Sequence, residues 1–394
     1  MRGSRLAQGG GNVLQMVRGK RAEAEAAGIR LLDLSIGEPR GPALLSARKA
    51  AAAAVMSEDE AMHTYQYNAS PAVPNFAQRF IQAHVSRNLD DCEVDYLPIP
   101  GIKPMLGLLP LACGCADHGV TVATTTSPGY PIPADWCGYH PLANQYAIPL
   151  HTENAFRFAP ADIQPGTGLV MMNYPHNPSG QVATLDWLRE ICAYCSEHNV
   201  RIFNDAAYIV LSHDDSSATL SQVAADFPDL SWAEAFTAAK LIGNGTGWHV
   251  GAMVGSADFI GDLKEVKGKT DAGFVAPMAA GVVAAFEDDQ EGIARYRRMY
   301  KESLGLLIQL LSGHGMRLAI EPAAGFFTLW IVPTHAFGQR IESAEQFNFM
   351  MIEETGVVGV HFPGYVRYAV CADIAEMAAD IGAAFERAAV GYGS

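Results

Sequence analysis

Short apolar segments alternate with helical stretches through the middle of the chain, and this alternation restricts the fold more than any other feature of the sequence. Residues 185–198, "LDWLREICAYCSEH", have helical periodicity between two such segments. Apolar strands that alternate with helices are typical of a sheet covered on both faces. The pattern predicts an α/β fold with a mainly parallel sheet. Its buried strands are expected at 120–126, 168–174, 200–207 and 249–255.

The flanking segments predict further helices and a second, smaller unit. Residues 44–56 and 72–90 have helical patterns ahead of the sheet, and a long helix is expected at 294–312. Two strands and a last helix follow it, at 325–333, 365–371 and about 372–389. We therefore expect a large domain, then a smaller α+β domain that the long helix introduces.

The size and charge of the chain exclude several classes of protein. Its 394 residues, 49% of them hydrophobic, are enough for one large domain or two with a substantial core. The formal net charge of −15 argues against nucleic acid or an anionic membrane as a partner, and no run of 18 apolar residues predicts a membrane span. The seven cysteines lack the spacing of a zinc site, and the N-terminal residues lack the apolar core of a signal peptide. We expect a cytoplasmic, enzyme-sized protein without a metal site.

Chemically distinctive residues follow the ends of the predicted strands, where open α/β sheets place their active sites. Asn177 follows "GLVMMNYP", Asp205 ends "VRIFND", and Tyr208 lies three residues further on. Lys240 follows the apolar segment "AEAFTAA", with Thr237 three residues before it. These side chains are therefore expected to share one edge of the sheet.

Two more segments bring binding groups toward the same edge. In "YLPIPGIKPM", Gly101, Ile102 and Lys103 form a turn into a helix, where backbone N–H groups can bind an anion. In "TTTSPGYP", Tyr130 follows the end of a predicted strand. The edge would then combine an anion site, an aromatic ring, a carboxylate and a lysine.

One cofactor, pyridoxal 5′-phosphate, would use all of these groups. A carboxylate such as Asp205 can keep a pyridine nitrogen protonated, an aromatic ring can stack on the heterocycle, and N–H groups with a hydroxyl can hold the phosphate. Apolar surroundings favour the free amine of Lys240, because desolvation penalises the ammonium form. That amine could form a Schiff base with the cofactor aldehyde. The residues therefore predict that Lys240 is the covalent anchor.

Six short motifs occur in the order that one enzyme family has, and on them the chain resembles the class I/II aminotransferases of the aspartate aminotransferase fold over about residues 30–390. They are "LSIGEP" (34–39), "SPGYP" (127–131), "HNPSG" (176–180), "NDAAY" (204–208), "TAAK" (237–240) and "YVRYAV" (365–370). The resemblance implies fold type I, with a mainly parallel seven-stranded sheet in the large domain and a smaller α+β domain. We expect residues 1–43 to form an N-terminal arm and part of the small domain, 44–290 the large cofactor-binding domain, and 291–394 the small domain.

The resemblance also implies catalytic roles. Lys240 would carry the Schiff base and move the proton, and Asp205 would pair with the pyridine nitrogen. Tyr208 and Asn177 would hydrogen-bond the phenolic oxygen, and Tyr130 would stack on the ring. Together these residues would let an amino acid give its amino group to the cofactor and a 2-oxo acid take it away.

The phosphate site departs from the family pattern at one position. The resemblance implies that backbone N–H groups at Gly101, Ile102 and Lys103 would hold the phosphate together with Thr237. His249 stands where the family has an arginine that clamps the phosphate. Histidine is a weaker and pH-dependent substitute for arginine.

The substrate and the partner subunit are also expected from the resemblance. Arg367 would bind the substrate α-carboxylate through both guanidinium nitrogens, helped by Gly37, and Asn177 would lie beside it. Tyr67 of "YQYNASPAVPNF" would reach the cofactor phosphate in the partner subunit of a homodimer, although Tyr65 competes for that assignment.

Three segments favour the diaminopimelate-type branch of the family: "GIK", "ENAFRFAP" (153–160) and "TDAGFVAPMAAGVVAAF" (270–286). They suggest an acidic or diamino-dicarboxylic amino acid, with glutamate and 2-oxoglutarate as the other pair. Two alternatives stay open at this point. One is a lyase or decarboxylase of the same fold, since the same residues serve those reactions. The other is a non-catalytic binding protein, which only His249 supports.

Overall fold

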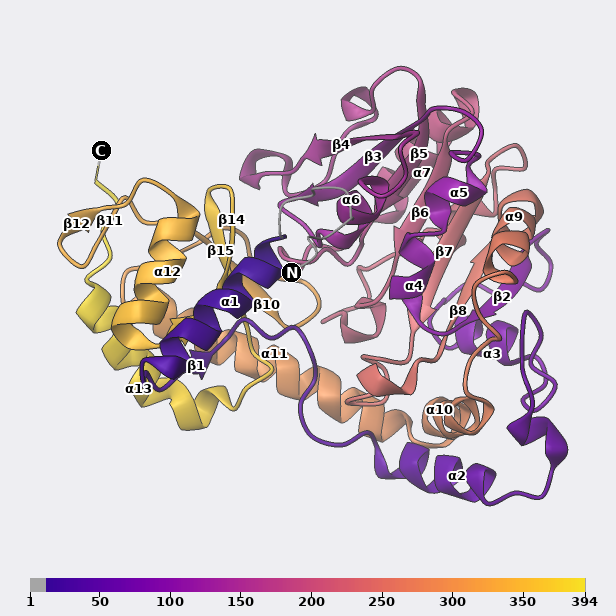
Figure 1. Ribbon diagram of the computed structural model, residues 1–394, viewed down its shortest axis with the longest axis horizontal. Coiled ribbons are helices and arrows are strands. Elements are labelled where there is room, and N and C mark those ends of the chain that lie inside the picture. The colour runs from indigo at the N-terminus through magenta and orange to yellow at the C-terminus, as the bar shows by residue number, and fades with distance from the viewer. Residues whose placement is uncertain (1–11, 394) are drawn as a thin grey trace, which may run out of the picture.

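A seven-stranded sheet forms the centre of the larger part of the molecule (Figure 1). The structure is a computed structural model, and it describes residues 12–393. The strands are β2 (Asp95–Ile99), β3 (Val120–Ser127), β4 (Ala143–Pro149), β5 (Thr167–Met172), β6 (Arg201–Asp205), β7 (Trp232–Thr237) and β8 (Gly251–Gly255). Their order is β2-β8-β7-β6-β5-β3-β4; β8 runs antiparallel to both of its neighbours, and the pairs from β7 to β4 are parallel. The predicted mainly parallel seven-stranded sheet is confirmed.

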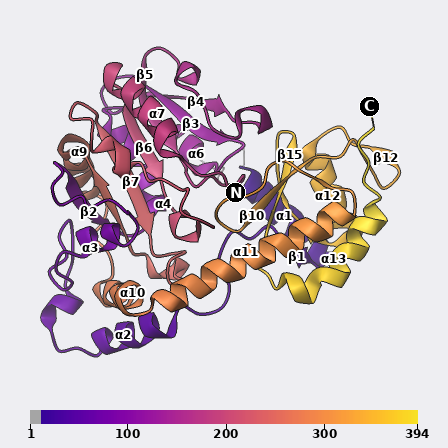
Figure 2. The same cartoon turned by 180° about the vertical axis from the view of Figure 1, so that it is seen from behind.

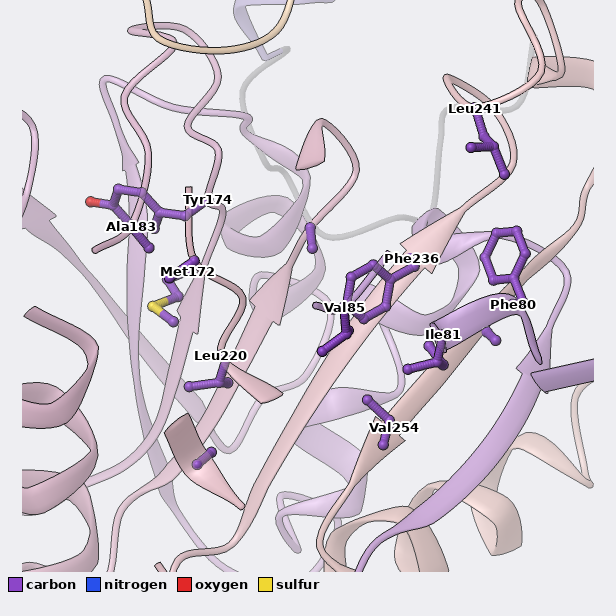
Figure 3. Packing of buried hydrophobic residues seen from close by; sticks show 14 of the residues in the cluster. Phe80, Ile81, Val85, Met172, Tyr174, Ala183, Leu220, Phe236, Leu241 and Val254 are labelled. Atoms are coloured by element: carbon purple, nitrogen blue, oxygen red, sulfur yellow. The ribbon is translucent and has the colours of Figure 1, made fainter. Parts of the chain in front are cut away.

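Apolar residues on both faces of this sheet explain why its strands have no polar alternation. In β5, Leu169 and Met171 pack with one cluster of buried side chains, and Val170 and Met172 pack with another. Successive side chains of a strand point to opposite faces, so each strand contributes to both clusters. Figure 3 shows the second cluster, in which Phe236 of β7 lies near residues of the helix at 76–82.

Helices cover the two faces. One face packs against α4 (Ile102–Leu106), α5 (Leu109–Ala112), α6 (Ile132–Cys137) and α9 (Ala257–Lys267). The other packs against α2 (Leu45–Val55), α3 (Phe76–Gln82), α7 (Leu185–Glu197), α8 (Ser221–Ala224) and α10 (Ala276–Asp288). These helices close the sheet on both sides, as the predicted α/β pattern requires.

The smaller part of the molecule has an antiparallel sheet of four strands in the order β14-β15-β10-β9. Its elements are β9 (Arg317–Leu318), β10 (Phe327–Ile331), α12 (Ala344–Thr355), β14 (Val360–Phe362), β15 (Tyr365–Ala369) and α13 (Ile374–Ala388), with a hairpin of β11 (His335–Ala336) and β12 (Gln339–Arg340). Figure 2 shows α11 (Gln290–Gly313) running from α10 toward this sheet. No helix within residues 12–393 has the length and apolar character needed to cross a membrane.

The N-terminal segment packs on the smaller part. β1 (Leu32–Asp33) pairs in parallel with β13 (Val357–Val358), and α1 (Val13–Ala26) contacts α12 and β14. The predicted assignment of residues 1–43 to an N-terminal arm and part of the small domain stays a prediction, and residues 1–11 of it lie outside the described residues. The boundaries at 44 and 290 stay a prediction.

The prediction of a helix over 72–90 is wrong in length: the observed helix, α3, is shorter and covers Phe76–Gln82. Asn75, with φ +56°, precedes the helix in the left-handed region and sets its start. After Ala83, the backbone N–H of Asp90 bonds the side chain of Asn88 at 3.0 Å, which is a local turn that competes with helix. Burial of Val85 and Leu89 is achieved without helical geometry, so their spacing misled the prediction.

Candidate active site

A cavity of about 640 Å³ lies at the carboxyl ends of the parallel strands, and we call it the inner cavity. Eleven of the residues predicted from the sequence line it: Gly37, Gly101, Ile102, Lys103, Tyr130, Asn177, Asp205, Tyr208, Thr237, Lys240 and His249. Asp205 is the last residue of β6 and Thr237 the last of its parallel neighbour β7. The prediction that strand ends gather these groups is therefore correct.

Lys240 lies in a turn after β7, in surroundings that favour its neutral amine. Burial lowers the pKa of Lys240, although Cys371, Glu38 and Asp205 oppose this effect electrostatically. Its Nζ lies 5.9 Å from the centre of the Phe326 ring. A lysine with a lowered pKa is a better nucleophile and base near neutral pH, because more of it is unprotonated.

Asp205 is a buried carboxylate in the wall of the inner cavity. The backbone N–H of Ala207 donates to Oδ1 at 3.1 Å, and Lys240 adds a favourable charge. Burial nevertheless raises the pKa of Asp205 to about 6. A cationic group that enters the cavity would stabilise the carboxylate form, and a protonated pyridine nitrogen is such a group.

The two tyrosines of the inner cavity remain hydrogen-bond donors. Burial raises the pKa of Tyr208, and Arg367 opposes that rise. Burial also raises the pKa of Tyr130, and the nearby charge of Asp205 adds to it. Both phenols therefore keep their protons at neutral pH and can donate to an anionic oxygen.

The phosphate end of the cavity has the predicted backbone geometry. Gly101 caps the N-terminus of α4 with φ +88°, a conformation that favours glycine. Thr237 Oγ accepts a hydrogen bond from the backbone N–H of Ala239 at 3.1 Å. Lys103 and His249 are exposed and both line the cavity. His249 lies in the left-handed region, with φ +54°, directly after a short turn of helix.

A second cavity of about 380 Å³ shares Gly37, Glu38, Tyr130, Asn177 and Tyr208 with the first, and we call it the outer cavity. Arg367 of β15 lies in its wall and is 4% exposed. Its guanidinium donates to Asn177 Oδ1 at 2.9 Å and to the carbonyl oxygen of Ser35 at 2.7 Å.

Arg367 is a buried cation with neutral partners. Within residues 12–393 it takes part in no ion pair, and its Nε has no hydrogen-bond partner. Burial lowers the pKa of Arg367 to about 10, so the group stays charged at neutral pH. A buried charge without a counter-ion is costly, and a carboxylate bound in the cavity would remove that cost.

Gly37 leaves the space that this arginine site needs. A Cβ added at Gly37 would lie 2.8 Å from Cζ of Phe327, whose ring stacks under the Arg367 guanidinium at 4.2 Å. Any side chain at 37 would therefore displace Phe327 or narrow the cavity.

The structure does not bring Tyr67 to either cavity. Its side chain is 52% exposed, with φ +46°, and its ring lies 5.5 Å from that of Tyr65. The segment is fixed to residues 267–272, since Tyr67 N–H bonds the carbonyl of Ala272 at 2.9 Å and its own carbonyl accepts from Lys267 Nζ at 3.3 Å. Exposure fits a contact with another subunit, and that role stays a prediction.

Three residues of the site are not predicted from the sequence. Asn173 at the end of β5 donates to the carbonyl oxygen of Asp205 at 2.8 Å and accepts from the N–H of Asn177 at 3.0 Å. Glu38 lines both cavities and Phe327 supports Arg367. Asn173 could have been noticed as a polar residue at the end of an apolar strand, whereas Phe327 resembles any core residue.

The donor set fits pyridoxal phosphate. The inner cavity contains a lysine with a lowered pKa, a buried carboxylate with a raised pKa, and two protonated phenols. Its far end offers the α4 N-terminus and Thr237, which suit a phosphate. Asp205, Lys240, Tyr208, Tyr130 and Thr237 are the residues that would hold it.

Comparison with known proteins identifies the family. The model of the aminotransferase class I and II family matches residues 29–382. The chain is 28% identical over 376 residues to the LL-diaminopimelate aminotransferase of Syntrophobacter fumaroxidans, with 90% of each chain covered. It is 26% identical over 370 residues to that of Dehalococcoides mccartyi, covering 88% of this chain and 89% of the relative.

Solved structures show the same fold. Substrate-bound BacF from Bacillus subtilis superimposes with a TM-score of 0.81 at 22% identity, covering 97% of this chain and 95% of that one. Aspartate aminotransferase from Thermus thermophilus with maleate gives a TM-score of 0.77 at 21% identity, covering 98% and 99%. The fold, the cavity and the family match lead to one conclusion: this chain belongs to the class I and II aminotransferases and is a pyridoxal-phosphate-dependent enzyme of fold type I.

Proposed function

We propose that the enzyme transfers the amino group of an acidic or diamino-dicarboxylic amino acid to a 2-oxo acid such as 2-oxoglutarate. The observation that carries this proposal is the buried, uncompensated Arg367 beside the cavity of Lys240. A carboxylate on Arg367 would direct the α-amino group of the same molecule toward Lys240. The names of the curated relatives, LL-diaminopimelate aminotransferases, support a diamino-dicarboxylic donor.

Lys240 is the proton carrier of the proposed reaction. Bound pyridoxal phosphate supplies an electron-accepting ring that makes the hydrogen on the substrate α-carbon acidic. The lowered pKa of Lys240 lets its amine accept that proton and return it to the cofactor side. Because the lysine side chain is long and flexible, one residue can act as base and then as acid.

The other residues of the inner cavity would control the charge distribution of the bound cofactor ring. The Asp205 carboxylate would stabilise a positive charge on the pyridine nitrogen of the bound cofactor, which would keep the ring electron-poor. Tyr208 would donate a hydrogen bond to the ring oxygen of the cofactor. The amide N–H of Asn177 would donate a second one, while its Oδ1 accepts from Arg367. Tyr130 lines the same cavity, where it would lie against the bound ring and help to exclude water.

The backbone N–H groups at Gly101, Ile102 and Lys103, together with Thr237, would hold the cofactor phosphate. His249 stands at the position where the resemblance places an arginine, and it lines the same end of the cavity. Lys103, which is exposed at the same end of the cavity, adds a cation. The phosphate site is therefore expected to bind the cofactor less tightly than a site with arginine would.

The enzyme is proposed to act as a homodimer in the cytoplasm. Tyr67 is exposed on a segment fixed by Lys267 and is free to reach the phosphate site of the partner subunit. Seven free cysteines, five of them buried, suit a reducing compartment. Size-exclusion chromatography with light scattering tests the dimer; a monomer that turns over at full rate would contradict it.

An absorbance experiment tests the proposed function. The protein is loaded with pyridoxal phosphate and titrated with glutamate or LL-diaminopimelate, beside Lys240→Ala. We expect a near-visible band that depends on Lys240 and shifts when the amino acid is added. If the band depends on Lys240 but the enzyme releases ammonia and an oxo acid without any acceptor, the result would instead support the lyase. No Lys240-dependent band would contradict the cofactor role of Lys240.

A further inference from the structure

The outer cavity contains more positive charge than one carboxylate requires. Besides Arg367, it is lined by Arg18 and Arg21 of α1, and Glu38 is the acidic residue among the described residues of its lining. The whole chain has a formal net charge of −15. Three guanidinium groups around one cavity of an acidic protein favour an anionic ligand, and how many of its anionic groups they can bind depends on which arginines are already paired within the protein.

One face of α1 forms part of the wall of the outer cavity. Leu14, Val17, Arg18 and Arg21 all line it, at spacings of three, four and seven residues from Leu14. Residues at these spacings share one side of a helix. The two arginines therefore project from a continuous helical face of α1, which contacts β14 and α12 in the smaller part of the molecule (Figure 1).

The position of α1 is fixed by contacts at both of its ends. Near the start, Asn12 caps the helix and its Nδ2 donates to Asp135 Oδ2 of α6 at 2.6 Å. Further along, Val17 and Ala24 are buried with Val358 in a small apolar cluster. Because these contacts hold the helix against both parts of the molecule, the backbone at 18 has a defined place beside the cavity.

The two arginines of α1 differ in whether their guanidinium group already forms an ion pair within the protein. Arg21 Nη1 lies 3.0 Å from Asp33 Oδ2, and its Nη2 lies 3.7 Å from Glu25. Arg18 is exposed and, within residues 12–393, forms no ion pair. Arg18 is therefore the guanidinium that is available to a ligand.

The two available cations lie at different depths. Arg367 is buried in the wall, while Arg18 is exposed at the rim. Arg18 does not line the inner cavity, where Gly101, Lys103 and Thr237 lie, so the cofactor phosphate is not its partner. A dicarboxylic amino acid has its two carboxylates at opposite ends, which suits one deep and one peripheral cation.

We propose that Arg18 binds the distal carboxylate of the substrate, within the same subunit whose Arg367 binds the α-carboxylate. The assignment rests on the proposed function, since it takes the α-carboxylate to be held by Arg367. It makes Arg18 a specificity-determining residue: it distinguishes dicarboxylic donors from neutral ones and takes no part in the proton transfer.

A comparison of two donors tests this proposal in the holoenzyme. Single-turnover rates are measured with glutamate and with glutamine, its uncharged counterpart, for the wild type and Arg18→Gln. Arg30→Gln is the matched control, because Arg30 is exposed and pairs with Asp380 away from both cavities. We expect Arg18→Gln to lower kcat/KM for glutamate roughly 10- to 100-fold through KM, with little change for glutamine and none from Arg30→Gln.

A binding measurement gives a second readout that is independent of turnover. Calorimetry of the holoenzyme with glutarate, a five-carbon dicarboxylate that has no amino group to transfer, should show a similar loss of affinity in Arg18→Gln but not in Arg30→Gln. Equal losses for glutamate and glutamine, or no loss for either, would overturn the role of Arg18 while leaving the aminotransferase reaction intact. A wild type that reacts with neither donor, nor with LL-diaminopimelate, would instead overturn the proposed function.

Discussion

The inner and outer cavities of this enzyme are built in different ways. The inner cavity takes most of its polar groups from the ends of neighbouring parallel strands: Asp205 ends β6, and Lys240 lies in the turn that follows β7. The outer cavity is assembled from segments far apart in sequence: α1, residues 35–38, and strands β10 and β15. The chemistry therefore depends mainly on one sheet, whereas the proposed substrate choice depends on how several separate segments of the chain pack together.

This contrast predicts how substitutions behave. Changes in the inner cavity should affect every substrate alike, because they alter the reaction itself. Changes in the outer cavity should affect substrates according to their carboxylates. A substitution that violates this rule would show that the two cavities are not separate in function.

Lys240→Ala should have the largest effect. Removing the amine removes both the nucleophile and the proton carrier, so single-turnover rates should fall by roughly 10³-fold or more for every amino acid. Lys269→Ala, which removes an exposed lysine paired with Glu265, is the control and should keep its rate. A loss that varied widely between donors would contradict the assignment of Lys240 to the chemistry.

Asp205→Asn should separate stability from function. The pKa of Asp205 is raised by burial from 3.8 to about 6, so the folded state holds its proton more tightly than the unfolded chain does. Its charge therefore lowers the stability of the apoprotein as the pH rises from about 4 to 6 and above, by about 3 kcal/mol at most.

Urea unfolding of the apoprotein checks this sign. At pH 8 Asp205→Asn should be more stable than the wild type, and at pH 4 the two should converge, while activity of the holoenzyme falls at both. Asp229→Asn, at an exposed position, should change neither. If Asp205→Asn were less stable than the wild type at pH 8, the buried charge of Asp205 would not destabilise the folded apoprotein.

Arg367→Lys should act on all donors through their shared α-carboxylate. Lysine keeps the positive charge, but it cannot make bidentate hydrogen bonds to a carboxylate or stack on the ring of Phe327. KM for any amino acid should rise roughly 10- to 100-fold, with a smaller change in kcat. Steady-state kinetics with glutamate and glutamine measure it. An effect on glutamate alone would give Arg367 the role that we assign to Arg18.

His249→Arg should have the smallest effect, and it should be a gain. An arginine at the rim of the inner cavity restores a permanent positive charge near the phosphate site, so the Kd for pyridoxal phosphate should fall by up to about 10-fold at pH 8. Fluorescence titration of the apoprotein measures it. Weaker binding would mean that the left-handed turn at 249, with φ +54°, points the side chain away from the phosphate.

The sequence predicted the inner cavity more completely than the outer one, for a physical reason. A strand ends where its apolar run ends, so polar residues such as Asp205 and Thr237 can be placed at one edge of the sheet from the sequence alone. No such rule places α1 over the cavity or Phe327 under Arg367, because those contacts depend on tertiary packing. Dependence on tertiary packing also explains the error in the length of α3. Val85 and Leu89 lie beyond the end of this helix, and they are buried without being helical.

The stoichiometry of a single turnover tests transamination itself. Holoenzyme mixed with excess glutamate, and no acceptor, should release one equivalent of 2-oxoglutarate per site and no ammonia. Adding a second 2-oxo acid should then restore the original absorbance band and yield one equivalent of the matching amino acid. Continuous release of ammonia, or more than one equivalent of oxo acid per site, would contradict transamination and favour the lyase.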